Sequence, residues 1–121
     1  MMAESGETGW ERRGRRTTQD RARAAFVTHL VALATGVPAQ EILCDLRGRD
    51  KVAEARAMAM YLLHVGFALP QNRVAAAFQR DRTTISHACS KIEKLRERRD
   101  VDRTLSQLEA CVQQAPTAVR A

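Results

Sequence analysis

Apolar residues recur at helical spacing along most of the chain, and glycine or proline separates the successive stretches. This pattern predicts helices that end near Gly36 and Gly66 and helices that begin at Pro38 and Pro70. Glycine favours helix C-termini, and proline favours the first helical turn. Almost no segment alternates polar and apolar residues over the length of a strand. The sequence therefore predicts an all-α fold, a compact bundle of helices.

Six helices are expected. The first begins near Arg21, and its expected buried stripe is Phe26, Leu30, Leu33 and Val37. The other expected helices cover residues 39–45, 52–65, 70–78, 83–95 and 101–112. The helix over 52–65 has the widest apolar surface, so we expect it to be the central and most buried one.

The chain length suits one domain with tails, because 121 residues are close to the usual size of a domain. We expect a flexible basic arm over 1–20, a folded helical domain over 21–113 and a frayed tail over 114–121. Two interpretations of the arm stay open: a solvated tail, or a segment that follows DNA phosphates through its arginines. Those arginines are Arg12, Arg13, Arg15 and Arg16.

The chain has a formal net charge of +6, which favours a polyanionic partner. Nucleic acid is the leading candidate, although charge alone also allows an acidic protein or a membrane surface. No apolar run approaches the roughly 20 residues that a membrane span needs, and the N-terminus lacks the apolar core of a secretory signal.

The three cysteines, Cys44, Cys89 and Cys111, form no CxxC pair and are odd in number. This favours reduced thiols and a cytoplasmic location over a disulfide framework. Cys89 and Cys111 fall on predicted buried stripes and are interpreted as small core residues. His29 and His64 have no partner at metal-ligand spacing and are interpreted as packed or partly exposed side chains.

Residues 70–95 carry the functional signal: a short helix, a tight polar turn and a second helix, which is the arrangement of a helix-turn-helix. The second helix of such a motif presents its N-terminal residues to base edges in the major groove. Hydrogen-bonding or cationic groups occupy its outward face: Thr83, Ser86, His87, Ser90, Lys91 and Lys94. From periodicity alone, an ordinary solvated helix face explains this pattern equally well.

Residues 78–93 read FQRDRTTISHACSKIE and closely resemble a signature of the C-terminal DNA-binding domain of DnaA, the bacterial chromosomal replication initiator. The upstream stretch 56–62, RAMAMYL, resembles another segment of that domain. The two stretches agree with the family in order and spacing, and the resemblance covers roughly residues 22–112.

The resemblance implies two sets of DNA-contacting residues. Those expected to read bases are Arg80, Asp81, Arg82, Thr83, Thr84 and His87. Those expected to contact phosphates or to enter the minor groove are Arg47, Arg49, Arg56, Ser86 and Lys91.

The chain also departs from the family pattern. Gln79 alone stands where the family has paired glycines, Arg82 replaces a histidine, and Glu54 and Ala55 replace an Arg-Pro pair. No Gly-rich loop with a Lys-Ser or Lys-Thr partner is present, so we expect no ATP binding. We accordingly expect a stand-alone DNA-binding domain without the initiator's ATPase.

Two functions follow as hypotheses. The first is sequence-specific binding of double-stranded DNA, as a monomer associated with the nucleoid, that regulates replication initiation or transcription. The alternative is a protein-interaction module that binds the replication initiator or its regulators with little specific DNA binding. We expect no enzyme activity, catalytic residue, metal site, cofactor or membrane partner, since no nucleophile–base pair, carboxylate pair or metal cluster stands out.

Overall fold

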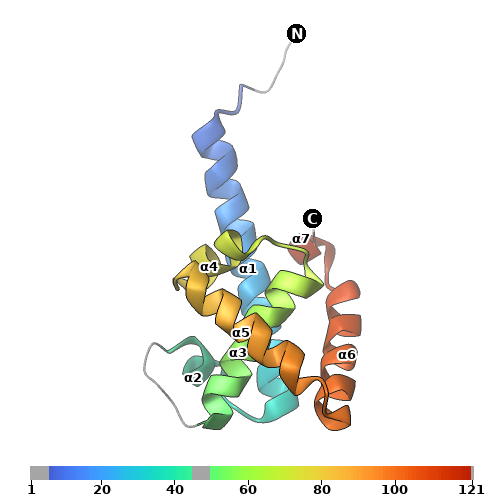
Figure 1. Ribbon diagram of the computed structural model, residues 1–121. Coiled ribbons are helices and arrows are strands. Elements are labelled where there is room, and N and C mark those ends of the chain that lie inside the picture. The colour runs from blue at the N-terminus through green and yellow to red at the C-terminus, as the bar shows by residue number, and fades with distance from the viewer. Residues whose placement is uncertain (1–5, 45–49, 121) are drawn as a thin grey trace.

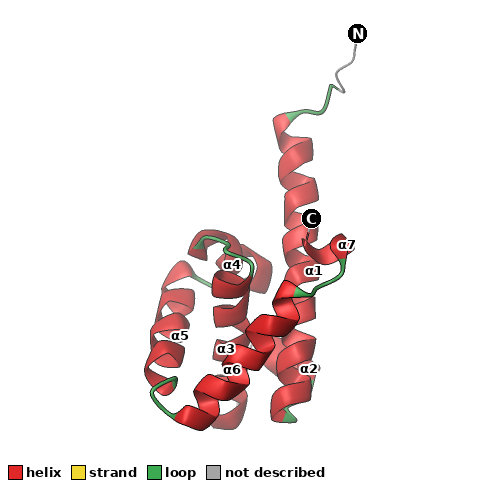
Figure 2. Ribbon diagram, turned by 90° about the vertical axis from the view of Figure 1, so that its right-hand side faces the viewer, coloured by secondary structure: helices red, strands yellow, loops and turns green. Residues whose placement is uncertain are grey.

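The computed structural model describes residues 6–44 and 50–120, and these ranges contain seven helices and no strand (Figures 1 and 2). The helices are α1 (Gly9–Thr35), α2 (Ala39–Leu43), α3 (Asp50–Gly66), α4 (Gln71–Phe78), α5 (Arg82–Leu95), α6 (Arg99–Gln113) and α7 (Thr117–Arg120). The predicted all-α fold is confirmed. None of the described helices is long and apolar enough to span a membrane.

The central helix is α3, as the width of its apolar surface predicted. It packs against α1, α2, α4, α5 and α6, and every residue from Ala57 to Leu63 is buried. The small side chains Ala57 and Ala59 allow neighbouring helices to approach it closely, so α3 supports the other helices from inside the bundle.

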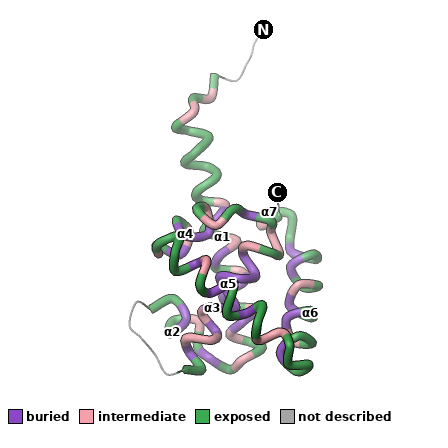
Figure 3. Tube along the Cα trace, in the orientation of Figure 1, coloured by how far each residue is buried: buried purple, intermediate pink, exposed green. Residues whose placement is uncertain are grey.

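The first helix is longer than the sequence predicted, because α1 begins at Gly9 rather than near Arg21. A capping box starts it: the amide of Glu11 donates to the hydroxyl of Thr8, and the Glu11 carboxylate accepts from the Thr8 amide. Residues 9–19 of α1, here named the N-terminal extension, project beyond the bundle and are largely exposed (Figure 3). The predicted arm is therefore helical over this stretch.

The buried stripe of α1 also differs from the predicted one. The residues that α1 buries are Asp20, Ala24, Val27, Thr28 and Val31, whereas the predicted stripe residue Leu33 is 84% exposed. Thr28 is tolerated in the core because its hydroxyl donates to the carbonyl of Ala24 at 2.7 Å. The prediction followed the larger apolar side chains and so selected a neighbouring face of the helix.

A buried carboxylate ties α1 to α4. Asp20 accepts two hydrogen bonds from the Arg73 guanidinium, at 2.8 and 2.9 Å, and a third from Arg23 at 3.1 Å. Arg23 also donates to the backbone carbonyls of Val119 and Arg120, at 2.8 and 2.9 Å. These bonds hold α7 against α1, so residues 117–120 of the predicted frayed tail form a docked helix.

The described cysteines divide into one buried and two exposed thiols. Cys89 lies in the core as predicted, and burial, assisted by the nearby Glu93 carboxylate, raises the pKa of its thiol to about 11. Cys111 was expected to be buried, but α6 turns it outward and buries Val112 instead. Cys44 is exposed, and Cys89 is a packing residue whose thiol stays protonated at neutral pH.

Candidate nucleic-acid interface

The predicted helix-turn-helix is formed by α4 and α5. Gln79 ends α4 in the left-handed conformation, with φ at 57° and ψ at 49°. Its amide donates to Ala76, and the amide of Arg80 donates to Ala75 at 2.9 Å, which is a Schellman motif. Glycine usually occupies this position because it adopts a positive φ without strain, so Gln79 holds this conformation at a cost in free energy.

The inner face of α5 is fixed in the core. Ile85 and Ile92 are fully buried, and Ala88 and Cys89 lie between them. At the end of α5, the Arg96 guanidinium donates to Glu109 at 2.8 Å and to other groups of α3 and α6. The Glu109 carboxylate holds the pKa of Arg96 above its ordinary value. The helix is therefore anchored along its length and at its C-terminal end.

The outer face of α5 carries most of the predicted DNA contacts. The exposed members are Arg82, Thr83, Thr84, His87 and Lys91, and Ser86 is half-buried. The helix begins at Arg82, one residue earlier than predicted, so Arg82 belongs to the helix and not to the turn.

The N-terminus of α5 has no side-chain cap. Asp81 occupies the N-cap position, but its side chain makes no capping hydrogen bond, and the first turn contains no acidic residue. The backbone N–H groups at the start of α5 therefore have no side-chain acceptor and can donate to an adjacent phosphate.

A shallow groove between α3 and α5 brings several predicted residues together. Four of them line it: Arg56, Thr84, His87 and Lys91. Ala53, Ala57, Met60 and Ala88 complete its walls. No sequence pattern predicts these apolar wall residues, because their place in the groove depends on how two distant helices pack.

Two of the predicted contact arginines are engaged with α2. Arg56 donates to the carbonyls of Ile42 and Glu41, at 2.8 and 2.9 Å. Arg80 donates to the carbonyl of Cys44 at 2.9 Å. The last carbonyls of a helix lack partners inside it, so the two arginines complete the end of α2 and join it to α3 and to the turn.

The remaining predicted contacts, Arg47 and Arg49, lie outside the described residues. The chain enters that segment from Cys44, whose carbonyl Arg80 holds, and leaves it at Asp50, where α3 begins. Among the described residues, no group of three His, Cys, Asp or Glu side chains gathers in a way that could hold a metal ion.

Comparison with known families agrees with this geometry. A family model described as the bacterial DnaA protein helix-turn-helix matches residues 24–92, which include α3, α4 and most of α5. The chain belongs to this family. No curated protein sequence matches it significantly.

Solved structures show the same DnaA relationship. A crystal structure of a DNA replication initiation factor matches with a TM-score of 0.70 and 30% identity, covering 86% of this chain and 31% of that one. A structure of the replication initiator DnaA bound to AMPPCP and single-stranded DNA matches with a TM-score of 0.67 and 30% identity, covering 88% and 31%. This chain spans about a third of the length of each of these chains.

Proposed function

We propose that this chain binds double-stranded DNA in a sequence-specific manner through the outer face of α5, and thereby regulates replication initiation or transcription. The observation that carries the proposal is the contrast between the two faces of α5. Its inner face is locked by Ile85 and Ile92, and its outer face offers hydrogen-bonding groups near the helix N-terminus. Such a helix can enter the major groove with its side chains already oriented.

In this proposal the exposed groups divide into readers and positioners. Asp81, Thr83, Thr84 and His87 contact base edges, which is where sequence is read, and Arg82 lies beside them as a candidate reader. Ser86 and Lys91 contact phosphates, which fix the register of the protein on the duplex. Arg47 and Arg49 are proposed for the minor groove on the family resemblance alone.

Arg82 is the candidate reader whose chemistry differs most from the family pattern. It is exposed, and the structure shows no ion pair between it and Asp81 or any other described carboxylate. A guanidinium can pair with guanine, or it can move to a phosphate and add affinity without discrimination. Because Arg82 is unrestrained, we favour the phosphate role and expect relaxed specificity relative to the initiator.

Arg56 and Arg80 also support the fold in this proposal. Each hydrogen-bonds to backbone carbonyls at the end of α2, so each substitution would disturb the fold of that end as well as any DNA contact. Lys91 makes no hydrogen bond to another described side chain and is the cleaner probe of a phosphate contact.

The test is fluorescence anisotropy with a duplex that contains the initiator's binding box and with a scrambled duplex, each over a salt series. We expect the box duplex to bind more tightly at every salt concentration. Lys91→Ala should weaken binding to both duplexes and reduce the magnitude of the salt dependence of binding by about 1. Arg103→Ala, which removes the same charge from the exposed face of α6, is the matched control. A specificity ratio near one would overturn the proposal and favour the protein-interaction alternative.

A further inference from the structure

We propose that the N-terminal extension is a second DNA-contacting element, in which Arg13 and Arg16 bind phosphates of the same duplex beside the site read by α5. This inference rests on the proposed function. It extends that function from the helix-turn-helix to a part of the chain outside the matched family region, which begins at residue 24.

The first argument is uncompensated charge. The extension carries four arginines, but they differ in their partners. Arg15 forms an ion pair with Glu7, and Arg12 donates to the Glu7 carbonyl at 3.1 Å. Arg13 and Arg16 have no carboxylate within ion-pair distance among the residues that the structure describes. These two guanidinium groups therefore retain their full charge for a polyanion.

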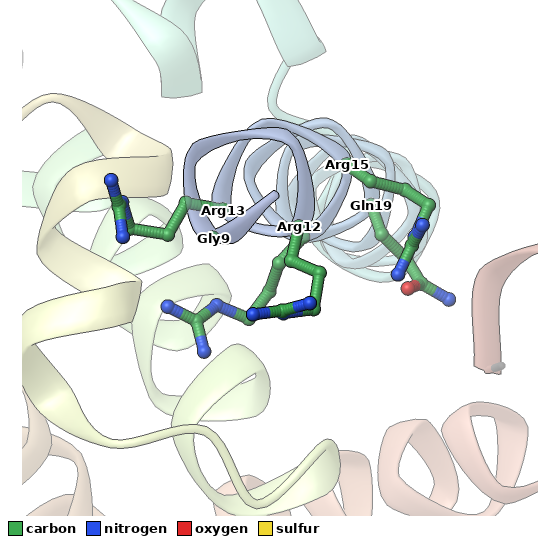
Figure 4. A pocket seen from close by; sticks show the side chains of 6 residues that line it. Gly9, Arg12, Arg13, Arg15 and Gln19 are labelled. Atoms are coloured by element: carbon green, nitrogen blue, oxygen red, sulfur yellow. The ribbon is translucent and has the colours of Figure 1, made fainter. Parts of the chain in front are cut away.

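The second argument is direction. Arg13 and Arg16 are three residues apart in a helix, so they share a face. They line a hollow together with Asn72, Arg73 and other residues of α4. Figure 4 looks along α1 and shows Arg13 pointing to the side where α4 lies, while Arg15 and Gln19 point the other way. The unpaired arginines thus face the first helix of the helix-turn-helix.

The third argument is the position of α4 in such complexes. The first helix of a helix-turn-helix crosses the DNA backbone while the second lies in the groove. Arg73 and Arg23 share the single carboxylate of Asp20, so this cluster keeps one net positive charge. Arg13 and Arg16 supply the further positive charge that a phosphate would meet beside α4.

The shape of the molecule sets the reach of this contact. α2 lies at one end of the bundle, and the extension projects beyond the other end, past α4 (Figure 1). Eleven helical residues span about 16 Å, or about five base pairs of duplex. The extension would therefore lengthen the footprint on one side only, the side away from α2.

The exposed arginines also form a surface that is built for a polyanion and not for a small ligand. A wide, open hollow is lined by Gly9, Arg12, Arg13, Arg15, Arg16 and Gln19. No apolar side chain closes it, and small-molecule sites are mostly enclosed and apolar. A phosphate backbone needs only charge in reach, which this surface supplies.

The experiment uses the duplex that the wild-type protein selects from a random library. Three duplexes of equal length are compared. In the first the selected site is central, so flanking DNA extends on both sides. In the other two the site lies near one end or the other, so flanking DNA is long on one side only. The test variant is Arg13→Ala/Arg16→Ala. The matched control is Arg12→Ala/Arg15→Ala, which removes the same charge from the arginines that Glu7 engages. Circular dichroism checks that both variants keep their helix content.

The salt slope is the change in the logarithm of the binding constant with the logarithm of the salt concentration. We expect this slope to be smaller in magnitude by nearly 2 for the test variant than for the wild type, on duplexes that extend on one particular side. The advantage of the wild-type protein should then shrink about tenfold between 50 and 200 mM salt. On the duplex that is short on that side, the variant should bind like the wild type. The control variant should lose less on every duplex.

Equal losses for both variants, or a loss that is the same with the flank on either side, would overturn the inference and indicate a general charge effect. A loss that appears only when two duplexes bind one protein would overturn it as well, since the contact would then be to a second DNA molecule. If no duplex is selected at all, the proposed function fails and this inference falls with it. If a site is selected but the test variant is unchanged, only this inference fails.

Discussion

The two basic or polar helical surfaces of this protein, the outer face of α5 and the N-terminal extension, differ in what lies behind them. α5 has Ile85 and Ile92 fully buried on its inner face and packs against α3 and α4. The extension has no buried residue before Asp20, and its side chains surround a helix in solvent (Figures 1 and 3). The outer face of α5 is therefore held in place by the core, whereas the extension is fixed mainly where α1 enters the bundle.

The difference corresponds to two kinds of DNA contact. Reading a base edge requires donors and acceptors held within a fraction of an ångström, which needs a helix locked in a core. Contacting a phosphate requires only a long cationic side chain in reach, and this contact carries no sequence information. The structure places short polar groups on the rigid helix and unpaired arginines on the projecting one.

The largest expected effect concerns the support of α5. Ile85→Ala should lower the free energy of unfolding by about 4 kcal/mol, because the side chain is fully buried and its loss leaves a cavity behind the proposed reading helix. Trp10→Ala in the extension, where the side chain is 69% exposed, should change it by less than about 0.5 kcal/mol. Urea denaturation followed by circular dichroism measures both. Comparable losses in the two variants would break the comparison.

A smaller expected effect comes from comparing two carboxylates, one buried and one near the surface, that pair with arginine side chains. Asp20→Ala should cost about 2 to 3 kcal/mol of unfolding free energy, since it leaves the largely buried Arg23 and Arg73 without their shared partner. Glu7→Ala breaks a partly exposed pair with Arg15 and should cost less than about 1 kcal/mol. Thermal and urea denaturation of the two variants gives the values. If Glu7→Ala is the more damaging change, the extension is not the loosely held region described above.

The smallest expected effect concerns the backbone strain at Gln79 in the turn between α4 and α5. Gln79→Gly should raise the free energy of unfolding by about 0.5 to 1 kcal/mol, because Gln79 is held at a positive φ that glycine adopts without cost. Gln79→Ala should give no gain, since alanine keeps the Cβ that causes the strain. A destabilised Gln79→Gly protein would mean that the glutamine side chain supports the turn, which the structure does not indicate.

Much of the fold could be predicted from the sequence. The apolar periodicity located all the helices from α2 to α6, and Gly36 ends α1 as expected, with φ at 77° and its amide bonded to Ala32. The start of α1 was missed although the Thr8-x-x-Glu11 spacing is a capping-box signature. The prediction relied on apolar stripes, and the extension, which has no buried side chain, has no stripe.

The candidate site was predictable where it depends on one helix and unpredictable where it depends on several. The exposed face of α5 follows from the period of that helix, so Thr83, His87 and Lys91 were placed correctly on the outside, whereas Ser86 is half-buried. The bonds of Arg56 and Arg80 to α2 join residues 14 to 36 positions apart in the sequence. No local pattern reports such a contact.

The measurement that tests the account most directly is the specificity ratio, the affinity for the selected duplex divided by the affinity for a scrambled duplex of equal length. We predict that Thr83→Ala lowers this ratio about tenfold, because it removes a base contact from the rigid helix. Arg13→Ala/Arg16→Ala should weaken binding to both duplexes and leave the ratio unchanged. A Thr83→Ala protein with an intact ratio would contradict the placement of sequence reading on the outer face of α5.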